Sequence, residues 1–358
     1  MKPAHHIRLS SGRIIGEGQP CFIVAEVGNN HQGDISLARQ MVEEAARAGV
    51  DAVKFQKRDN AALLTAEGLK TPYTGPNSFG PTYGEHRDAL ELSIEEMADL
   101  KALSESLGLI FFASAWDMKS LEAMNSLTPE LIKICSADLV NTPYLRRCGE
   151  MGQPIVISTG MSDYEQIDKA VAELRRYHNN IVILHCNSSY PCPEEHICLP
   201  VMHDIRARYA LPTGYSGHER GLAPTLAAVA LGAVMVERHF TLDKTMRGTD
   251  HQVSLEPAEL AMLVRMTREI ESSLKGMEKK VFPGEASAAL KLRKSIVAAR
   301  PLLAGTVITT ADLTVKSPGN GLSPDNWDDV IGNTLTRDVK CDEQIVPEML
   351  AIPLNGDA

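Results

Sequence analysis

Two histidines, His218 and His239, carry the most informative chemistry in this sequence. Each lies at the end of a short apolar segment, His218 in YSGHE and His239 in VERHF, of the kind that forms a buried parallel strand. Neutral imidazole nitrogens at the ends of neighbouring strands can bind one divalent ion together. Two protein ligands leave positions open for water and substrate, so the pair predicts a catalytic, Lewis-acidic metal rather than two structural core histidines.

Lysines and serines lie at the ends of other apolar segments of the same kind. Lys54 and Lys133 end apolar runs, where a cation is costly unless it faces an anion. Hydroxyls or free backbone N–H groups come from Ser136, Ser158, Thr159, Gly160 and Ser216. Together these groups predict a binding site for a phosphate and a carboxylate at the ends of the strands. The alternative is that both lysines pair with internal carboxylates, for which Glu26 and Glu237 are available.

Two acids are candidates for proton transfer or substrate binding. Glu26, on the first apolar segment, lies beside the expected cations and suits a general acid or base. Asp250, in RGTDHQ, follows His239 on the same loop and is a candidate contact for a substrate hydroxyl or a metal-bound water; a solvated loop acid is the alternative. The strand-end candidates are Glu26, Lys54, Gln56, Ser114, Lys133, Ser136, Ser158, Asn187, Ser188, Ser216, His218 and His239.

Eight apolar segments must position these groups, and they alternate with helix-sized stretches. Besides the two that carry the histidines, they are 21–30, 50–58, 109–117, 131–138, 154–160 and 181–190. This is the pattern of a (β/α)8 TIM barrel, an α/β fold whose chemistry lies at the C-terminal ends of the strands. A doubly wound sheet is the alternative, but AEVGNNHQG lacks the G-x-G-x-x-G spacing of its phosphate-binding turn.

Helical patterns connect these strand segments. The stretch 34–49 begins with Asp34 as an N-cap and ends at Gly49, and 93–108 opens with a Ser-x-x-Glu capping box. Further helices are predicted at 163–178, 223–232 and 256–276. The Gly-, Pro- and Tyr-rich stretch 65–92 is predicted as a long loop over the active site, because such loops in compact domains are usually functional.

The sequence pattern changes after residue 276. A linker-like stretch precedes short β-like runs, Gly turns and one-turn helices at TADL and PEML. We therefore expect a barrel domain over 1–276, a linker over 277–293 and a small domain over 294–358. A domain of roughly 65 residues builds little core of its own, so it is expected to lean on another surface, that of a partner subunit.

Composition excludes several classes of function. The net charge of -10 and the pI near 5.6 argue against a nucleic-acid or anionic-membrane partner. No apolar run approaches the ~20 residues that span a bilayer, and the first residues lack the apolar core of a signal peptide. The seven cysteines indicate reduced thiols in a cytoplasmic protein. A zinc site is the alternative for Cys186, Cys192, Cys198 and His196, although their spacing matches no structural zinc pattern.

Ordered motifs extend along almost the whole chain. They are AEVGNNHQGD, VKFQK, ELIKICSAD, ISTGM, LHCNSSYP, GYSGHE, VERHFTLDKTMRGTDH and SPGNG. In this order they resemble the sialic acid (N-acetylneuraminate) synthase family, which includes the legionaminate and pseudaminate synthases. The resemblance implies a TIM barrel followed by a small antifreeze-protein-like (SAF, β-clip) domain. It also implies a domain-swapped homodimer, in which the small domain caps the partner's barrel.

The resemblance further implies a reaction. Members condense phosphoenolpyruvate with the open-chain aldehyde of an N-acetylated hexosamine such as N-acetylmannosamine. C3 of phosphoenolpyruvate attacks C1 of the sugar, water adds at C2, and phosphate leaves with C–O cleavage, giving a nine-carbon 2-keto-3-deoxy acid. By resemblance, His218 and His239 would bind Mn²⁺ or Mg²⁺, and Glu26 would act as acid/base.

The remaining roles are also carried over by resemblance. Phosphoenolpyruvate would be held by the catalytic lysines Lys54 and Lys133 and by Ser114, Ser136, Ser158, Ser188 and Ser216. The sugar would face Gln56, Tyr190 and Asp250, with Asp138 and Asn187 as further substrate-binding residues.

Three positions depart from the family pattern. Ser317 stands where neuraminate-type members carry an arginine that contacts the acetamido group. Asp138 stands where glutamate is frequent, and Ser188 where asparagine is expected, with Asn187 one residue earlier. The sugar therefore stays open, with a 2,4-diacetamido-trideoxyhexose of the legionaminate or pseudaminate kind as the alternative. We expect no phosphorylated aldose, since the sequence reveals no second anion pocket, and no purely carbohydrate-binding protein, since Glu26 and both histidines are present.

Overall fold

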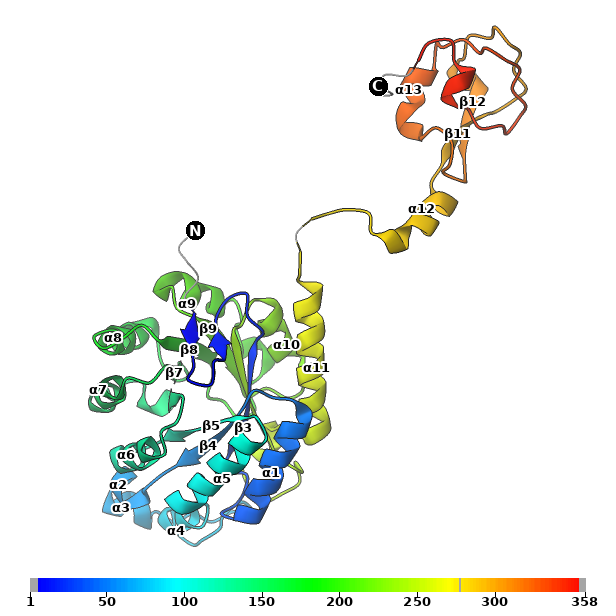
Figure 1. Cartoon of the computed structure of the whole chain (residues 1–358). Helices are drawn as coiled ribbons and strands as arrows, with labels where there is room; N and C mark the ends of the chain where they lie inside the picture. Colours follow the sequence, from blue (N-terminus) through cyan, green and yellow to red (C-terminus); the bar gives the residue numbers. More distant parts are fainter. Residues whose placement is uncertain (1–5, 277, 354–358) are drawn as a thin grey trace. The chain divides into compact units, whose positions relative to one another are not determined.

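The computed structural model describes residues 6–276 and 278–353. The chain divides into two compact units, with the boundary between Lys275 and Gly276 (Figure 1). Each unit has a hydrophobic core of its own, so each is described separately.

The first unit is a closed barrel of parallel strands. In chain order the strands are β3 (Phe22–Gly28), β4 (Ala52–Lys57), β5 (Ile110–Ala115), β6 (Ile132–Ile134), β7 (Ile155–Ser158), β8 (Ile181–Cys186), β9 (Thr213–Gly217) and β10 (Met235–His239). Each strand pairs with the next, and β10 pairs with β3 to close the ring. Six of the eight strands lie within the segments predicted from the sequence, β9 and β10 overlap the two segments that carry the histidines, and the TIM barrel is confirmed.

Helices surround the strands (Figure 1). They are α1 (Ile35–Ala48), α5 (Ile94–Ser106), α6 (Met118–Ser126), α7 (Thr142–Met151), α8 (Tyr164–Leu174), α9 (Val201–Tyr209), α10 (Ala223–Ala230) and α11 (Pro257–Ser273). The predicted caps are present: the Asp34 carboxylate accepts from two backbone N–H groups of α1, and Gly49 ends the helix with a φ of 83°. Ser93 and Glu96 form the predicted capping box.

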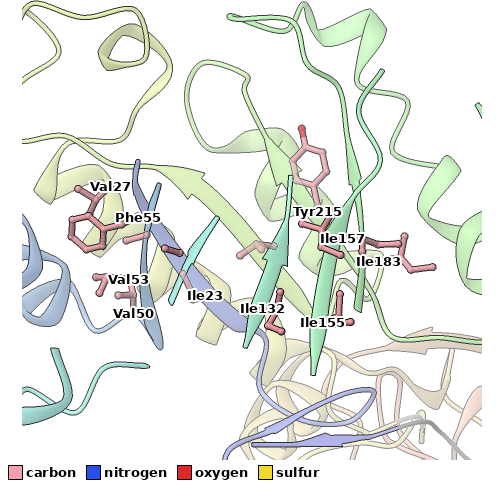
Figure 2. Packing of buried hydrophobic residues seen from close by; sticks show 14 of the residues in the cluster. Ile23, Val27, Val50, Val53, Phe55, Ile132, Ile155, Ile157, Ile183 and Tyr215 are labelled. Carbon is pink, nitrogen blue, oxygen red and sulfur yellow. The ribbon is translucent and has the colours of Figure 1, made fainter. Parts of the chain in front are cut away.

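Alternation along the strands creates two apolar layers. Side chains such as Ile23, Val53 and Ile155 point away from the barrel axis and pack under the helices (Figure 2). Their neighbours Phe22 and Ala52 belong to a separate cluster that fills the barrel interior near the N-terminal ends of the strands, called the lower interior below. Because the period of a strand is two, residues further along the inward faces must point into the upper interior, where the candidate site lies.

A short N-terminal hairpin joins the lower interior cluster. Its strands β1 (Ile7–Arg8) and β2 (Ile14–Ile15) pair antiparallel. The buried side chains of Ile7, Leu9 and Ile15 belong to the interior cluster. The sequence patterns did not predict this hairpin, because two-residue strands carry almost no periodic signal.

The segment after β4 contains short helices rather than one irregular loop. They are α2 (Asn60–Leu63), α3 (Ala66–Lys70) and α4 (Tyr83–Asp88). A bridge between Pro72 and Thr82 closes the stretch between α3 and α4. Single-turn 3-10 helices follow β6 (Ser136–Asp138), β8 (Glu194–His196) and β10 (His251–Val253).

The second unit begins with a 3-10 turn (Pro283–Glu285) and α12 (Ala286–Leu292). Strands β11 (Ser295–Ala298) and β12 (Leu313–Lys316) pair antiparallel, and α13 (Trp327–Val330) follows. Three further 3-10 turns occupy Thr310–Asp312, Pro324–Asn326 and Pro347–Met349, so the one-turn helices predicted at TADL and PEML are confirmed. The unit's small core includes Ile296, Leu302 and Ile345. In the described parts of both units, no helix has the length and apolar character needed to cross a membrane.

Candidate functional site

A cavity of about 230 Å³ opens at the C-terminal ends of the barrel strands. Its walls come from inward-facing positions of all eight barrel strands and from the turns that follow them. The lining residues are Glu26, Lys54, Gln56, Ser114, Trp116, Lys133, Cys135, Ser136, Ala137, Ser158, Met161, Cys186, Ser188, Tyr190, Ser216, His218, Glu237 and His239. Twelve of the fifteen site residues predicted from the sequence are among them.

Two lysines and two glutamates form the floor of this cavity. Lys54 Nζ lies 2.6 Å from Glu26 Oε2 and 3.6 Å from Glu237 Oε1. Lys133 Nζ lies 3.7 Å from the same Glu237 oxygen. All four residues are buried. The pairing with internal carboxylates, raised as an alternative from the sequence, is therefore present, and it occurs inside the cavity rather than away from it.

Serine hydroxyls complete the floor. Lys54 donates to Ser114 Oγ at 3.2 Å, and Lys133 donates to Ser158 Oγ at 2.8 Å. Ser216 Oγ donates to Glu237 at 3.3 Å. Each cation thus has a neutral acceptor besides its carboxylate, and an incoming anion can replace these contacts without leaving a charge unpaired.

The two glutamates differ in their affinity for a proton. Burial raises the pKa of Glu26 above its ordinary value, although Lys54 opposes the shift. Burial also acts on Glu237, but Lys133 and Lys54 outweigh it and lower the pKa of that carboxyl. Carboxyls whose pKa values diverge in this way suit separate roles, one exchanging a proton and one staying ionised.

The two histidines face each other across β9 and β10. Their ring centroids lie 5.4 Å apart, and the ring of Tyr190 stacks on His218 at 4.0 Å. His218 Nδ1 lies 2.6 Å from the carbonyl oxygen of Asn187. Because a carbonyl can only accept, Nδ1 carries the proton and Nε2 keeps the lone pair that a metal requires.

The donor set fits a divalent ion with two protein ligands. His239 Nδ1 is buried without a hydrogen-bond partner, and Asp250 Oδ2 lies 4.0 Å from it. Within residues 6–276 and 278–353, no group of three or more His, Cys, Asp or Glu side chains is placed to share a metal. An ion bound here would keep positions for water and for a substrate oxygen.

Comparison with known proteins gives this architecture a family. The model of the NeuB family matches residues 41–279, and the model of the SAF domain matches residues 293–351.

The chain belongs to the NeuB family.

Several relatives of this NeuB-family chain are matched along nearly their whole length. The N-acetylneuraminate-9-phosphate synthase of Homo sapiens is 39% identical, covering 96% of this chain and 96% of that protein. The N,N'-diacetyllegionaminic acid synthase of Legionella pneumophila is 38% identical, covering 90% and 93%. The crystal structure of the N-acetylneuraminic acid synthetase from Leptospira borgpetersenii, in complex with citrate, matches with a TM-score of 0.70 and 32% identity, covering 80% and 95%.

Three residues predicted for the site lie outside the cavity of the NeuB-family chain. The Asp138 carboxylate accepts from Asn141 and from the Cys135 thiol. The Asn187 side chain donates to the carbonyl of His196, so only its backbone oxygen serves the site. Asp250 lines a neighbouring cavity instead.

The structure brings into the cavity some residues that were not predicted as site residues, among them Glu237, which the sequence offered only as an ion-pair partner of the lysines. Glu237 precedes the histidine of VERHF by two residues and therefore shares its inward face, a signal that strand alternation carries. Trp116 and Cys186 line the cavity at the ends of β5 and β8. From the sequence, apolar residues at such positions are expected to belong to the hydrophobic core. Asp250 was predicted to lie near His239 only because it follows that histidine on the same loop. In the structure its Oδ2 lies 4.0 Å from His239 Nδ1.

A second cavity, of about 330 Å³, adjoins the first. Gln56, Trp116 and Tyr190 line both cavities. Three arginines, Arg58, Arg87 and Arg247, line the second one. Aromatic residues of the 65–92 stretch supply part of its wall, so that stretch does border the site. The expectation that no second anion pocket exists considered only the strand ends, whereas these arginines lie after β4, in α4 and in the loop after β10.

Proposed function

We propose that this chain is a metal-dependent synthase that condenses phosphoenolpyruvate with an acylated amino sugar, releasing phosphate and a nonulosonic acid. The observation that carries the proposal is the joining of two buried lysines, a ring of serines and a histidine pair in one cavity. The lysines and hydroxyls suit a small substrate with a phosphate and a carboxylate. The histidine pair suits a substrate whose carbonyl must be polarised.

In this proposal Lys54 and Lys133 bind phosphoenolpyruvate with Ser114, Ser136, Ser158, Ser188 and Ser216. C3 of phosphoenolpyruvate forms a bond with C1 of the open-chain sugar, and the aldehyde oxygen takes up a proton. Water adds at C2, and the C–O bond to phosphate breaks. Glu26, whose pKa is raised by burial, is the group we assign to exchange protons at this centre.

His218 and His239 would hold Mn²⁺ or Mg²⁺. The ion supplies a Lewis acid for the aldehyde oxygen. The chain's own contribution is to fix the His218 ring through Asn187 and Tyr190, which limits the directions in which its free nitrogen points.

The sugar is the open part of the proposal. Gln56, Tyr190 and Asp250 are the residues we place beside it. Relatives are named for different products, among them N-acetylneuraminate 9-phosphate and N,N'-diacetyllegionaminic acid. N-acetylmannosamine and a 2,4-diacetamido-trideoxyhexose are therefore both retained as core structures, and Ser317 favours the second because a serine is a weaker donor than an arginine.

The assembly and the compartment complete the proposal. A barrel domain over 1–276, a linker over 277–293 and a small domain over 294–358 would form a domain-swapped homodimer. The free thiols of all seven cysteines support a reducing, cytoplasmic setting. The net charge of -10 supports the absence of a nucleic-acid partner.

Phosphate release from phosphoenolpyruvate tests the function. The purified chain is assayed with Mn²⁺ and a panel of amino sugars that includes N-acetylmannosamine and 2,4-diacetamido-2,4,6-trideoxymannose, each with and without a 6-phosphate where a hydroxyl permits it. We expect sugar-dependent phosphate release and a nonulosonic acid by mass spectrometry. Sugar binding without phosphate release, across the panel, would identify a carbohydrate-binding protein instead.

A further inference from the structure

We propose that Trp116 binds the acylamino group of the sugar, donating its indole N–H to the carbonyl oxygen of that group. The inference rests on the proposed function and adds a specificity-determining residue to it. It concerns the wall that the two cavities share, which is formed by Gln56, Trp116 and Tyr190.

Trp116 is placed for contact with a ligand rather than for packing in a core. It follows directly after β5, and its side chain is half-buried. It belongs to none of the hydrophobic clusters that residues 6–276 and 278–353 form, although it is one of two tryptophans in the chain. A large aromatic side chain in this position gains further burial when a ligand fills either cavity.

The indole nitrogen of Trp116 is an unused donor. Nε1 is buried and has no hydrogen-bond partner in the described part of the chain. Gln56, on the same wall, has both ends of its amide engaged, since it donates to Glu26 at 3.0 Å and accepts from Arg58. Because a buried donor without a partner costs free energy, an acceptor that arrives with the substrate would satisfy Trp116 at the moment of binding.

Neighbouring contacts fix the direction of this donor. The backbone N–H of Trp116 donates to the carbonyl oxygen of Lys57 at 3.1 Å. The guanidinium group of Arg58 lies over the indole, 4.7 Å from the centre of the ring, and is itself held by Glu91 at 3.2 Å. One face of the indole is therefore covered, and a donor held in place in this way can select among acceptors at little entropic cost.

The chemistry of the donor selects the acceptor. An indole N–H can donate but cannot accept, so its complement is a group that accepts without donating. The carbonyl oxygen of an acylamino group has this property, whereas a sugar hydroxyl brings a proton that needs a partner of its own. The anionic oxygens of phosphoenolpyruvate are assigned to Lys54, Lys133 and their serines, so the neutral acceptor belongs to the sugar.

Steady-state kinetics of Trp116→Phe tests the inference, because phenylalanine keeps an aromatic ring and removes the N–H. With N-acetylmannosamine or 2,4-diacetamido-2,4,6-trideoxymannose, we expect kcat/KM to fall roughly 5- to 100-fold, mainly through KM of the sugar. KM for phosphoenolpyruvate should change by less than ~2-fold, as should all constants of the control Trp327→Phe, which alters a tryptophan at the core of the second unit. An unchanged sugar KM, with phosphate release intact, would overturn the inference and leave the proposed function standing.

Mannose, which carries a hydroxyl in place of the acetamido group, identifies the acceptor. Exchanging N-acetylmannosamine for mannose should lower kcat/KM at least ~5-fold more in the wild type than in Trp116→Phe, because both changes remove the same hydrogen bond. Equal losses in the two proteins would place the acceptor elsewhere and overturn the assignment to the acyl carbonyl.

Nuclear magnetic resonance observes the hydrogen bond in the wild-type protein. Isotopic labelling of tryptophan nitrogen gives one indole signal each for Trp116 and Trp327, and either phenylalanine variant assigns both. The alditol of N-acetylmannosamine lacks the aldehyde and cannot react; added with phosphoenolpyruvate and Mg²⁺, it should move the Trp116 proton signal downfield and leave that of Trp327 in place. An unmoved Trp116 signal at saturating alditol, with binding verified by calorimetry, would overturn the inference even if Trp116→Phe failed to fold.

Discussion

Lys54 and Lys133 are 2% and 3% exposed, which would be untenable for two isolated ammonium groups. Their stability in the free enzyme comes from Glu26 and Glu237, which lie within 4 Å of them. Burial raises the pKa of Glu26, so this carboxyl takes up a proton more readily than that of Glu237. Proton uptake there would leave the four residues with a net positive charge that attracts an anionic substrate.

The two histidines give a direct prediction for metal dependence. His218→Ala or His239→Ala should lower turnover by roughly 1,000-fold, because loss of one of two protein ligands removes a Lewis acid that contributes several kcal/mol. The far-ultraviolet circular dichroism should be unchanged, and Mn²⁺ affinity measured by electron paramagnetic resonance should fall. His203→Ala, at an exposed position of α9, is the control. Full activity after treatment with EDTA would refute the metal assignment.

His31 gives a prediction for pH. Burial, assisted by Arg58, lowers the pKa of His31 to about 4 in the folded state, against about 6.5 when unfolded. Between pH 6.5 and about pH 4 the unfolded chain therefore binds more protons than the folded protein does. The free energy of unfolding decreases as the pH is lowered through this range.

Urea unfolding at pH 7.0 and pH 4.5 measures this effect. In His31→Gln the loss of stability between the two pH values should be smaller than in the wild type by about 2–3 kcal/mol. His203→Gln, which changes an exposed histidine, should leave the wild-type loss unaltered. An identical pH dependence in His31→Gln would show that His31 titrates normally in the folded protein.

Among the elements, a buried ion pair connects β9 and β10 behind the histidines. Arg238 Nη1 lies 2.8 Å from Glu219 Oε1, and the side chains are 1% and 0% exposed. Tyr215 and Thr225 donate to the same carboxylate. Each partner is the chain neighbour of a histidine of the candidate metal pair, so the ion pair fixes the distance between the strand ends that present the two rings.

Removal of one partner should be costly. Arg238→Met leaves the Glu219 charge buried and unpaired, and we expect it to lower the free energy of unfolding by about 3–5 kcal/mol. The double variant Arg238→Met with Glu219→Gln should recover part of this loss. Arg265→Met, which breaks the exposed pair with Glu269 on α11, should cost less than ~0.5 kcal/mol. Thermal and urea unfolding would compare the three, and a similar cost for both single variants would contradict the argument.

The elements differ in how clearly the sequence predicts them. Buried strands of the barrel have a strong apolar signal and a period of two, which together place Lys54, Lys133 and His239 on inward faces. The 65–92 stretch has neither, and its short helices and the positions of Arg58 and Arg87 depend on tertiary contacts such as the ion pair with Glu91. Asp138 and Asn187, which do not line the first cavity, lie just beyond strand ends, where alternation no longer predicts the direction of a side chain.

For the whole molecule, the proposed homodimer is the main prediction. Leu302, Ile308 and Leu335 belong to the small core of the second unit, whereas Leu303 and Val307 are 70% and 56% exposed. Apolar groups exposed on so small a unit favour burial against another surface. Light scattering should give twice the chain mass of 39.0 kDa. A stable, fully active monomer would refute the dimer.

The division of the site into two cavities has a consequence for inheritance. The groups assigned to phosphoenolpyruvate and metal sit on strands distributed around the barrel, whereas much of the second cavity comes from one contiguous stretch between β4 and α5. A single recombination event could exchange that stretch and leave the strands untouched. Descendants of such an event would build a different sugar acid with the same bond-forming chemistry, so diversity of product can arise in this lineage without reinvention of the catalyst.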